Sequence, residues 1–354
     1  MGQKFMKDEQ YTYEKAGVSI DKATQAHKII GKLIEKTYKF RKGKFGEVSG
    51  EYGHYAGLIE IGEGLCLALH VDGVGTKVLV SQLMNKYDTI GIDLVAMHAN
   101  DLVCMGAEPV ALEDYLAVEE ADPELIAKIM KGIVAGAEIA QMAVIGGETA
   151  TMPDIIKGEV KGKGYDLSAM SVGVVKKTDI ITGEKIVPSD IIIGLESSGI
   201  HSNGLTLARK ALLDLGGLTI EQVGADLLRP TKIYSREVLE IIQNIEVHGL
   251  AHITGGAFSK LNRLSFGNIG FALTDLPDPP RIFKNIQEIT NISDYEMYRT
   301  FNMGIGFCII TDESNYSEIE KICRKYKTKT YQIGKIIEEK GVFITNTRGQ
   351  KIKL

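Results

Sequence analysis

The chain has 354 residues, of which 44% are hydrophobic and 25% are charged, and this composition excludes disordered, collagen-like and coiled-coil proteins. Its 41 Lys and Arg residues are outnumbered by 46 Asp and Glu residues, and the net charge of −5 argues against a broad nucleic-acid-binding surface. The four cysteines form no C-x-x-C pair and no apolar run reaches the ~18–20 residues of a membrane span, so we expect a soluble, cytoplasmic protein with reduced thiols.

The first half of the chain has the pattern of a mixed α/β unit. An amphipathic helix is predicted over 21–38, and the basic segment 36–44 is either a solvated loop or a flap that closes on phosphates. Strands are then predicted at 58–61, 65–71, 110–118, 143–147 and 164–175, and helices at 88–105 and 123–142. The polar stretch 176–190 places a boundary between a first domain, 1–176, and a second, 177–354.

The second half predicts another α/β unit. Strands are expected at 190–196, 268–274, 303–311 and 328–337, and helices at 202–215, 231–243, 281–290 and 315–325. The expected fold class is therefore α/β, of the α+β kind, in two domains with a mixed N-terminal sheet.

A glycine-rich motif with three polar side chains follows a predicted strand. In DGVGTK (72–77) the glycines can expose backbone N–H groups, while Asp72, Thr76 and Lys77 offer a metal ligand, a hydroxyl group and a cation. A tight turn without a ligand is the alternative interpretation.

Further carboxylates lie on the next helix and after a later strand. Asp93, Asn100 and Asp101 share one face of the predicted helix, and Glu148 follows the strand that leads into GGETATMP. Neighbouring unpaired carboxylates are unfavourable without a cation, so we predict a nucleotide–Mg²⁺ site shared with Asp72. The alternative is that these carboxylates face solvent or form salt bridges with lysines.

Two loops of the second half are suited to binding phosphate. SSGIHSNG (197–204) and AHITGGAF (251–258) each place small polar residues and glycines between a strand and a helix, where backbone N–H groups are available to an anion. Two such loops favour a phosphorylated substrate. His201 and His252 are either polar residues satisfied by the backbone, or proton donors or phosphate ligands.

The chain as a whole resembles the phosphoribosylformylglycinamidine cyclo-ligase family. The resemblance rests on motifs in the family's order: AGVSID (16–21), DGVGTK, YDTIGIDLVAM (87–97) with Asn100-Asp101, GAEP (106–109), GGETATMP, SSGIHSNG, ITGGAF and EMYRTFNMGIG. It implies two α/β domains, a homodimer in which N-terminal strands build a barrel-like interface, and ATP with Mg²⁺. Neither nucleic acid nor membrane is an expected partner.

The resemblance also implies a reaction and residue roles. The expected enzyme is a ligase of purine biosynthesis that uses ATP to close formylglycinamidine ribonucleotide to aminoimidazole ribonucleotide, with phosphoryl activation of the formyl oxygen and attack by nitrogen. Metal binding is assigned to Asp72, Asp93, Asp101 and Glu148, and catalysis to Lys77, His201 and His252. Nucleotide and phosphate binding is assigned to Gly73, Gly75, Thr76, Asn100, Gly146, Gly147, Thr149, Ser198, Ser202, Asn203, Gly204, Thr254, Gly255 and Gly256.

The chain departs from the family pattern at a few motif positions. Ile200 replaces a proline, Ala257 replaces the third glycine of a TGGGF motif, and Thr151 replaces a glutamate. The alternatives to the cyclo-ligase are an ATP-dependent kinase of the thiamine monophosphate kinase type and a nucleotide-binding regulatory protein without turnover.

Overall fold

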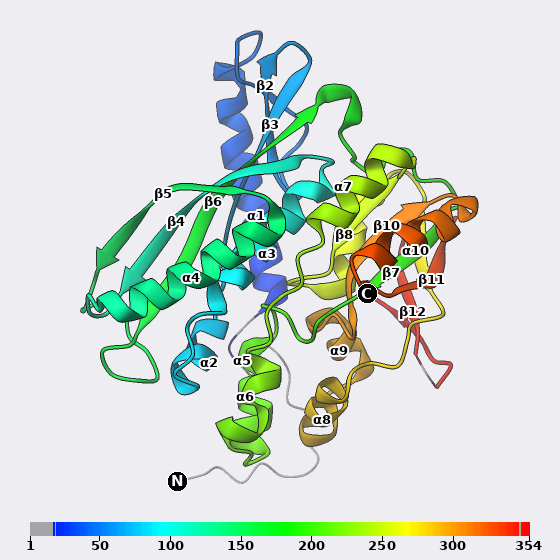
Figure 1. Cartoon of the computed structure of the whole chain (residues 1–354). Helices are drawn as coiled ribbons and strands as arrows, with labels where there is room; N and C mark the ends of the chain where they lie inside the picture. Colours follow the sequence, from blue (N-terminus) through cyan, green and yellow to red (C-terminus); the bar gives the residue numbers. More distant parts are fainter. Residues whose placement is uncertain (1–16, 18, 347) are drawn as a thin grey trace.

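The structure is a computed structural model that describes residue 17, residues 19–346 and residues 348–354. Ala16 and Val18 of the AGVSID motif, and the start of the predicted first domain, lie outside the described residues. Two mixed β-sheets, each with its own helices, lie side by side (Figure 1). This arrangement confirms the predicted two-unit α/β architecture.

The first unit is built on an open six-stranded sheet in the order β1-β2-β3-β6-β4-β5. Neighbouring strands are antiparallel except β4 and β5, which run parallel. The strands are β1 (Glu47–Ser49), β2 (Gly57–Gly62), β3 (Leu65–Gly73), β4 (Glu108–Val118), β5 (Ala143–Thr151) and β6 (Tyr165–Lys176). The helices are α1 (Ile20–Ile34), η1 (Glu35–Phe40), α2 (Lys77–Leu83), α3 (Ile90–Cys104) and α4 (Pro123–Ala140).

The second unit contains a seven-stranded sheet in the order β13-β12-β9-β11-β7-β10-β8. Its strands are β7 (Ile191–Glu196), β8 (Gly249–His252), β9 (Gly270–Leu273), β10 (Ile305–Thr311), β11 (Thr330–Ile337), β12 (Gly341–Thr345) and β13 (Lys351–Lys353). Strands β7 and β10 are apolar and almost completely buried, as expected for strands covered on both faces.

The second unit also contains most of the short helices. They are η2 (Lys177–Asp179), α5 (Leu205–Arg209), the π-helical η3 (Lys210–Leu215), α6 (Ile220–Leu227), α7 (Ser235–Asn244), η4 (Ala257–Leu264), α8 (Arg281–Thr290), α9 (Asp294–Thr300), η5 (Glu313–Asn315) and α10 (Tyr316–Lys325). Sequence patterns predict α7, α8 and α10 but not α6 or α9, which are among the shorter helices.

Helix α3 lies between the two units. On one side it packs against β3, β4, β6 and α4, and on the other it contacts β8 and α7 of the second unit. Nearly all of its side chains are therefore buried, including the polar ones. Buried polar groups need partners inside the protein, so the chemistry of α3 is set by what each unit presents to it.

One face of the first sheet carries helices, while the opposite face is exposed in the single chain. Cross-strand pairing places Val71, Met170 and Tyr115 on this open face, and Val71 is 73% exposed. Ile145 on the edge strand β5 is 63% exposed. An apolar face of this kind typically marks an interaction surface. The strands in the described part of the chain form an open sheet and do not close into a barrel.

No helix in the described part of the chain combines the length and the apolar character needed to cross a lipid bilayer.

Candidate functional site

A cleft of about 810 Å³ brings together residues from three predicted motifs. Asp72 of DGVGTK, Asn203 of SSGIHSNG and the segment 254–256 of ITGGAF all line it. Helix α1 and residues that follow ITGGAF complete the walls. A second hollow of about 750 Å³ next to the 176–185 segment contains none of the predicted site residues.

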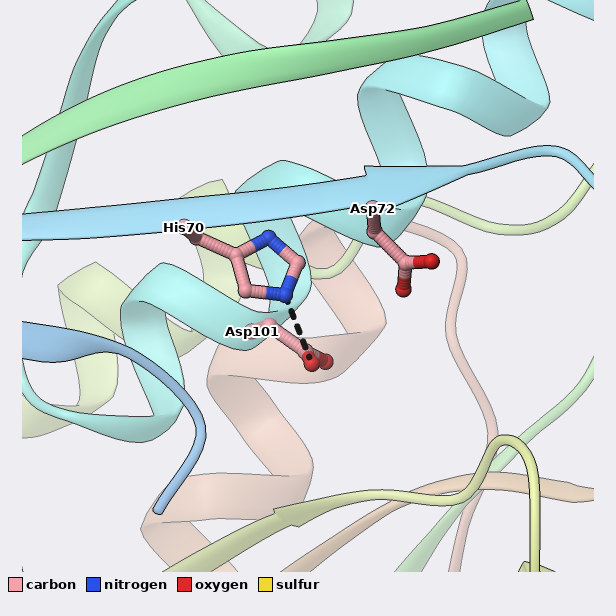
Figure 2. A group of neighbouring side chains, drawn as sticks. All are labelled: His70, Asp72 and Asp101. Atoms are coloured by element: carbon pink, nitrogen blue, oxygen red, sulfur yellow. Dashed lines mark ion pairs between the residues drawn. The ribbon is translucent and has the colours of Figure 1, made fainter. Parts of the chain in front are cut away.

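A histidine and two aspartates converge at the edge of this cleft (Figure 2). His70 and Asp72 lie two residues apart on β3, so both side chains point to the α3 side of the sheet. Asp101 comes from the last turn of α3. One ligand atom from each of the three side chains lies within 4.8 Å of the others, which is a geometry that can hold a metal ion.

Asp101 is buried and ionised. Its Oδ1 lies 2.7 Å from His252 Nδ1, and its Oδ2 lies 3.3 Å from His70 Nε2. Burial would raise the pKa of Asp101, but the adjacent imidazoles of His252 and His70, with the nearby charge of Lys260, hold it well below its usual range. On its other side, His252 Nε2 accepts a hydrogen bond from Asn100 Nδ2 at 3.2 Å. His252 therefore positions Asp101 and does not itself line the cleft.

Asp72 is more exposed to the cleft than Asp101. Its Oδ1 accepts a hydrogen bond of 2.7 Å from the backbone N–H of Gly73. Burial and the neighbouring charge of Asp101 both raise the pKa of Asp72. A divalent cation between the two carboxylates would remove this repulsion.

Two cations of the cleft are not identified by the sequence motifs. Lys260 and Arg263 both line the cleft and stack over the ring of Tyr55, with distances to its centroid of 5.4 Å and 5.0 Å. Burial lowers the pKa of Lys260, and the charges of Asp101 and Asp72 oppose that effect. The only signal in the sequence is their position just after ITGGAF, on η4.

Lys77 and Asp93 form a separate, fully buried ion pair. Lys77 Nζ donates to Asp93 Oδ1 at 2.7 Å and to the carbonyl of Arg229 at 2.6 Å. Asp93 Oδ1 also accepts hydrogen bonds from the backbone N–H and the hydroxyl of Thr231, at 2.7 and 2.6 Å. The salt bridge to lysine, offered above as the alternative, is thus the state of Asp93. Neither side chain lines the cleft.

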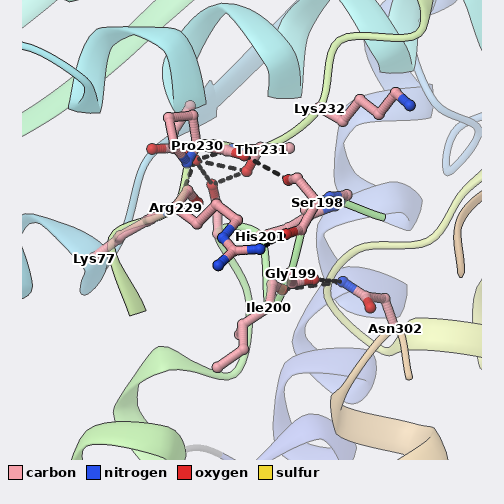
Figure 3. A network of polar contacts seen from close by, with 12 residues as sticks. Lys77, Ser198, Gly199, Ile200, His201, Arg229, Pro230, Thr231, Lys232 and Asn302 are labelled. Atoms are coloured by element: carbon pink, nitrogen blue, oxygen red, sulfur yellow. Dashed lines mark hydrogen bonds and ion pairs between the residues drawn. The ribbon is translucent and has the colours of Figure 1, made fainter. Parts of the chain in front are cut away.

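The SSGIHSNG loop is held by its own hydrogen bonds and by Asn302 (Figure 3). The backbone N–H of Ser198 donates to His201 Nε2 at 3.1 Å, and the Ser198 hydroxyl donates to the carbonyl of Pro230. His201 is buried with a φ of +66°, and burial lowers its pKa well below the ordinary value. The Ser202 hydroxyl donates a hydrogen bond to Asp93 and does not line the cleft. Of this motif, Asn203 faces the cleft.

The glycine-rich motif of β5 lies away from the acidic cluster. Cross-strand pairing aligns Gly73 on β3 with Glu148 on β5 across two intervening strands, a distance of about 14 Å at ~4.8 Å per strand. Gly146, Gly147 and Thr149 are exposed around Glu148 on the same edge strand. Within one chain, these residues do not join the Asp72 cluster.

Four other predicted residues have structural roles, in backbone turns or in contacts between the two units. Gly75 has a φ of +70° at the turn into α2, and Gly204 has a φ of +81° at the start of α5. Asn100 Oδ1 accepts from the backbone N–H of Tyr234, and its amide donates to the carbonyl of Lys232. The exposed Thr76 hydroxyl bonds to a threonine of α5.

Comparison with known proteins extends over almost the whole chain. Family models described as AIR synthase related protein match residues 53–175 as the N-terminal domain and 187–346 as the C-terminal domain. A phosphoribosylformylglycinamidine cyclo-ligase of Thermococcus gammatolerans is 48% identical over 339 residues, 95% of this chain and 98% of the relative. One of Pyrococcus furiosus is 45% identical over 339 residues, with the same two coverages of 95% and 98%.

Solved structures share the fold at low identity. Thiamine-monophosphate kinase from Stenotrophomonas maltophilia has a TM-score of 0.61 at 17% identity and covers 87% of this chain and 93% of its own. Hydrogenase maturation protein HypE in complex with ATP has a TM-score of 0.61 at 17% identity and covers 81% of this chain and 84% of its own.

Proposed function

Because this chain belongs to the phosphoribosylformylglycinamidine cyclo-ligase family, we propose that its cleft holds ATP and the ribonucleotide substrate for the ring closure. The chain is a ligase of purine biosynthesis that converts formylglycinamidine ribonucleotide to aminoimidazole ribonucleotide with ATP. The observation that supports this use of the cleft is its lining. The first unit contributes an acidic wall, Asp72 next to Asp101, and segment 254–263 of the second unit contributes a cationic wall of Lys260, Arg263 and glycine amides.

The cationic wall suits phosphate groups. Gly255 and Gly256 line the cleft, and the buried Thr254 hydroxyl beside them has no hydrogen-bond partner among the described residues. Lys260 adds a positive charge close to the same loop. The family resemblance gives the catalytic lysine role to Lys77, but Lys77 is buried in its ion pair with Asp93. We therefore assign the stabilisation of the transferring phosphoryl group to Lys260.

The acidic wall suits Mg²⁺. Asp72 and Asp101 supply the hard carboxylate oxygens that this ion prefers, and the mutual repulsion that raises the pKa of Asp72 is relieved by a cation. When bound, Mg²⁺ neutralises phosphate charge. Asp93 is not included, since its ion pair with Lys77 keeps it out of the cleft.

The chemistry required of the cleft is positioning and charge stabilisation. An amide oxygen is a poor leaving group, so the γ-phosphoryl group passes from ATP to the formyl oxygen and ADP is released. The amidine-side nitrogen then attacks the formyl carbon, the carbon–oxygen bond breaks, phosphate leaves with the electron pair, and the nitrogen loses a proton. Lys260 and the amides of 254–256 hold the phosphoryl oxygens during transfer, and Asn203 faces them from the second loop.

We further propose a homodimer through the open face of the first sheet. Val71, Tyr115 and Met170 form an apolar surface there that a second copy would bury, completing a barrel-like interface. Glu148 is exposed on the same sheet, about 14 Å from its own chain's Gly73. In the dimer it is available to the partner's site. The unit 1–176 then supplies the acidic cluster and dimer face, and 177–354 the glycine loops.

The test is release of ADP that depends on formylglycinamidine ribonucleotide, with formation of the imidazole product measured in parallel. Asp101→Asn should abolish most turnover. The matched control is Asp190→Asn, which disrupts another buried Asp–His pair, 2.7 Å from His248 and remote from the cleft. Turnover that is lost equally in both variants would refute the special role of Asp101. ADP release with thiamine monophosphate instead would favour the kinase alternative.

A further inference from the structure

His70 lies between a carboxylate and a second buried histidine. Only 9% of its surface is exposed, its Nε2 faces Asp101 Oδ2 at 3.3 Å, and its Nδ1 faces His98 Nδ1 at 3.2 Å. The two imidazole rings meet edge to face, with centroids 4.9 Å apart. Neither His70 nor His98 belongs to a motif that the sequence analysis singles out.

The partners of His98 define which of its nitrogens carries hydrogen. His98 Nε2 lies 3.3 Å from the backbone carbonyl of Asp72, and a carbonyl only accepts, so Nε2 carries the hydrogen. His98 is completely buried and contacts no carboxylate through its Nδ1, which leaves the neutral ring with Nδ1 as an acceptor. The Ser171 hydroxyl lies 2.8 Å from the same nitrogen, and it shares the single lone pair of that nitrogen with His70.

This assignment determines the state of His70. Two nitrogen lone pairs facing each other at 3.2 Å repel, so His70 Nδ1 carries the hydrogen that points to His98. In a neutral His70, Nε2 then presents a lone pair to the Asp101 carboxylate. An acceptor facing an acceptor at 3.3 Å requires a positive charge between or beside them. Lys260 is near, but it forms no hydrogen bond with Asp72 or Asp101 in the described part of the chain.

We propose that His70 Nε2 is the nitrogen ligand of a divalent metal site that Asp72 and Asp101 complete, and that His98 and Ser171 orient His70 for it. The ligand atoms of the three residues already lie within 4.8 Å of one another (Figure 2). A second hydrogen bond from the far nitrogen of a metal-binding histidine is the usual way of fixing its ring and tautomer. This inference rests on the proposed function, because Asp72 and Asp101 are also the carboxylates proposed there to bind Mg²⁺.

The nitrogen ligand changes which ion the site prefers. Mg²⁺ takes oxygen ligands and water, whereas imidazole favours transition metals, and Mn²⁺ accepts carboxylate and imidazole together. The site should therefore bind Mn²⁺ more tightly than Mg²⁺ in the absence of nucleotide. A site made of Asp72 and Asp101 alone would show little of this preference.

The experiment uses the full chain without nucleotide and Mn²⁺ as the probe. Mn²⁺ binding is measured from the electron paramagnetic resonance signal of the free ion, and pulsed measurements report ¹⁴N coupling from a directly bound imidazole. We expect ¹⁴N coupling in the wild type and its loss in His70→Asn, together with at least about tenfold weaker Mn²⁺ binding. His98→Phe, which keeps a ring but removes the acceptor, should weaken binding by roughly 10–100-fold.

The control is His248→Asn, which alters a histidine paired with Asp190 away from the cleft and should leave Mn²⁺ binding unchanged. Thermal unfolding of each variant shows whether it is folded, and ¹⁴N coupling of the wild type needs no variant. Mn²⁺ bound without ¹⁴N coupling, or not bound at all, would overturn the proposal. The positive charge facing Asp101 would then be a proton on His70 Nε2. A wild-type chain that releases no ADP in the presence of formylglycinamidine ribonucleotide would instead refute the proposed function, whatever Mn²⁺ does.

Discussion

Replacing Asp93 with asparagine tests whether this carboxylate serves the fold or the chemistry. The side chain is completely buried, and one oxygen accepts from Lys77, Thr231 and Ser202. Asparagine keeps an acceptor at that place but removes the charge, so Lys77 becomes a buried cation without a counter-ion. Breaking one side of a buried pair costs about 3–5 kcal/mol. In a unit of this size that corresponds to a fall in Tm of roughly 6–20 °C.

Urea unfolding of wild type, Asp93→Asn, Lys77→Met and the double variant measures this effect as a cycle. The double variant should lose less unfolding free energy than the two single variants lose together. Each single variant leaves one buried charge unpaired, and the double variant contains neither charge. Glu246→Gln is the matched control, since its pair with Lys185 at 2.8 Å is solvent-exposed and its loss should barely move the unfolding midpoint. If Asp93→Asn keeps wild-type stability but loses turnover, Asp93 is a site residue and the structural assignment is wrong.

Three further predictions follow from the same contacts. Lys260→Met should lower kcat, with partial recovery in Lys260→Arg, because a charge near the transferring phosphoryl group is lost; steady-state kinetics with both substrates measure it. The folded protein holds the pKa of Asp101 below its ordinary value of about 3.9. The ionised carboxylate therefore stabilises the fold fully above that pH, and this stabilisation is lost as the pH falls through the folded pKa. Acidification below pH 4 should lower the Tm of the wild type more than that of Asp101→Asn. Val71→Lys should convert a species of about twice 38.7 kDa in sedimentation into a monomer, whereas an unchanged mass would exclude the open sheet face as the interface.

Long, strongly patterned elements are the ones that sequence patterns predict well. The helix predicted at 281–290 is α8, and Asp122 caps α4 through hydrogen bonds to the two backbone N–H groups that follow Pro123. Strand β8 (Gly249–His252) is not among the predicted strands, because it is only four residues long and runs into the loop-like ITGG. It is a strand through its pairing with β10. Pairing of this kind depends on residues far along the chain, and local patterns do not contain it.

The site is predictable where one element supplies neighbouring residues. The period of a strand places His70 and Asp72 on one face, so the two-residue spacing in LHVDG is a signal that could have identified His70. Lys77 shows the limit of such reasoning. A lysine after a glycine-rich turn is typical of a phosphate ligand, but here a carbonyl of the second unit and a carboxylate of α3 enclose it. That enclosure depends on how the two units pack.

The polar residues on one face of helix α3 are all predicted to bind ligands, and the packing of α3 shows why they share that face. Asp93, Asn100 and Asp101 do share one face, but that face packs against the second unit and each residue contacts a different segment of it. Asp93 binds Thr231, Asn100 binds the backbone at 232 and 234, and Asp101 binds His252. Such buried polar contacts are favourable only when every partner is in place, so they hold the two units in one relative position. The two walls of the cleft come from different units, and their relative position is therefore set before any ligand binds.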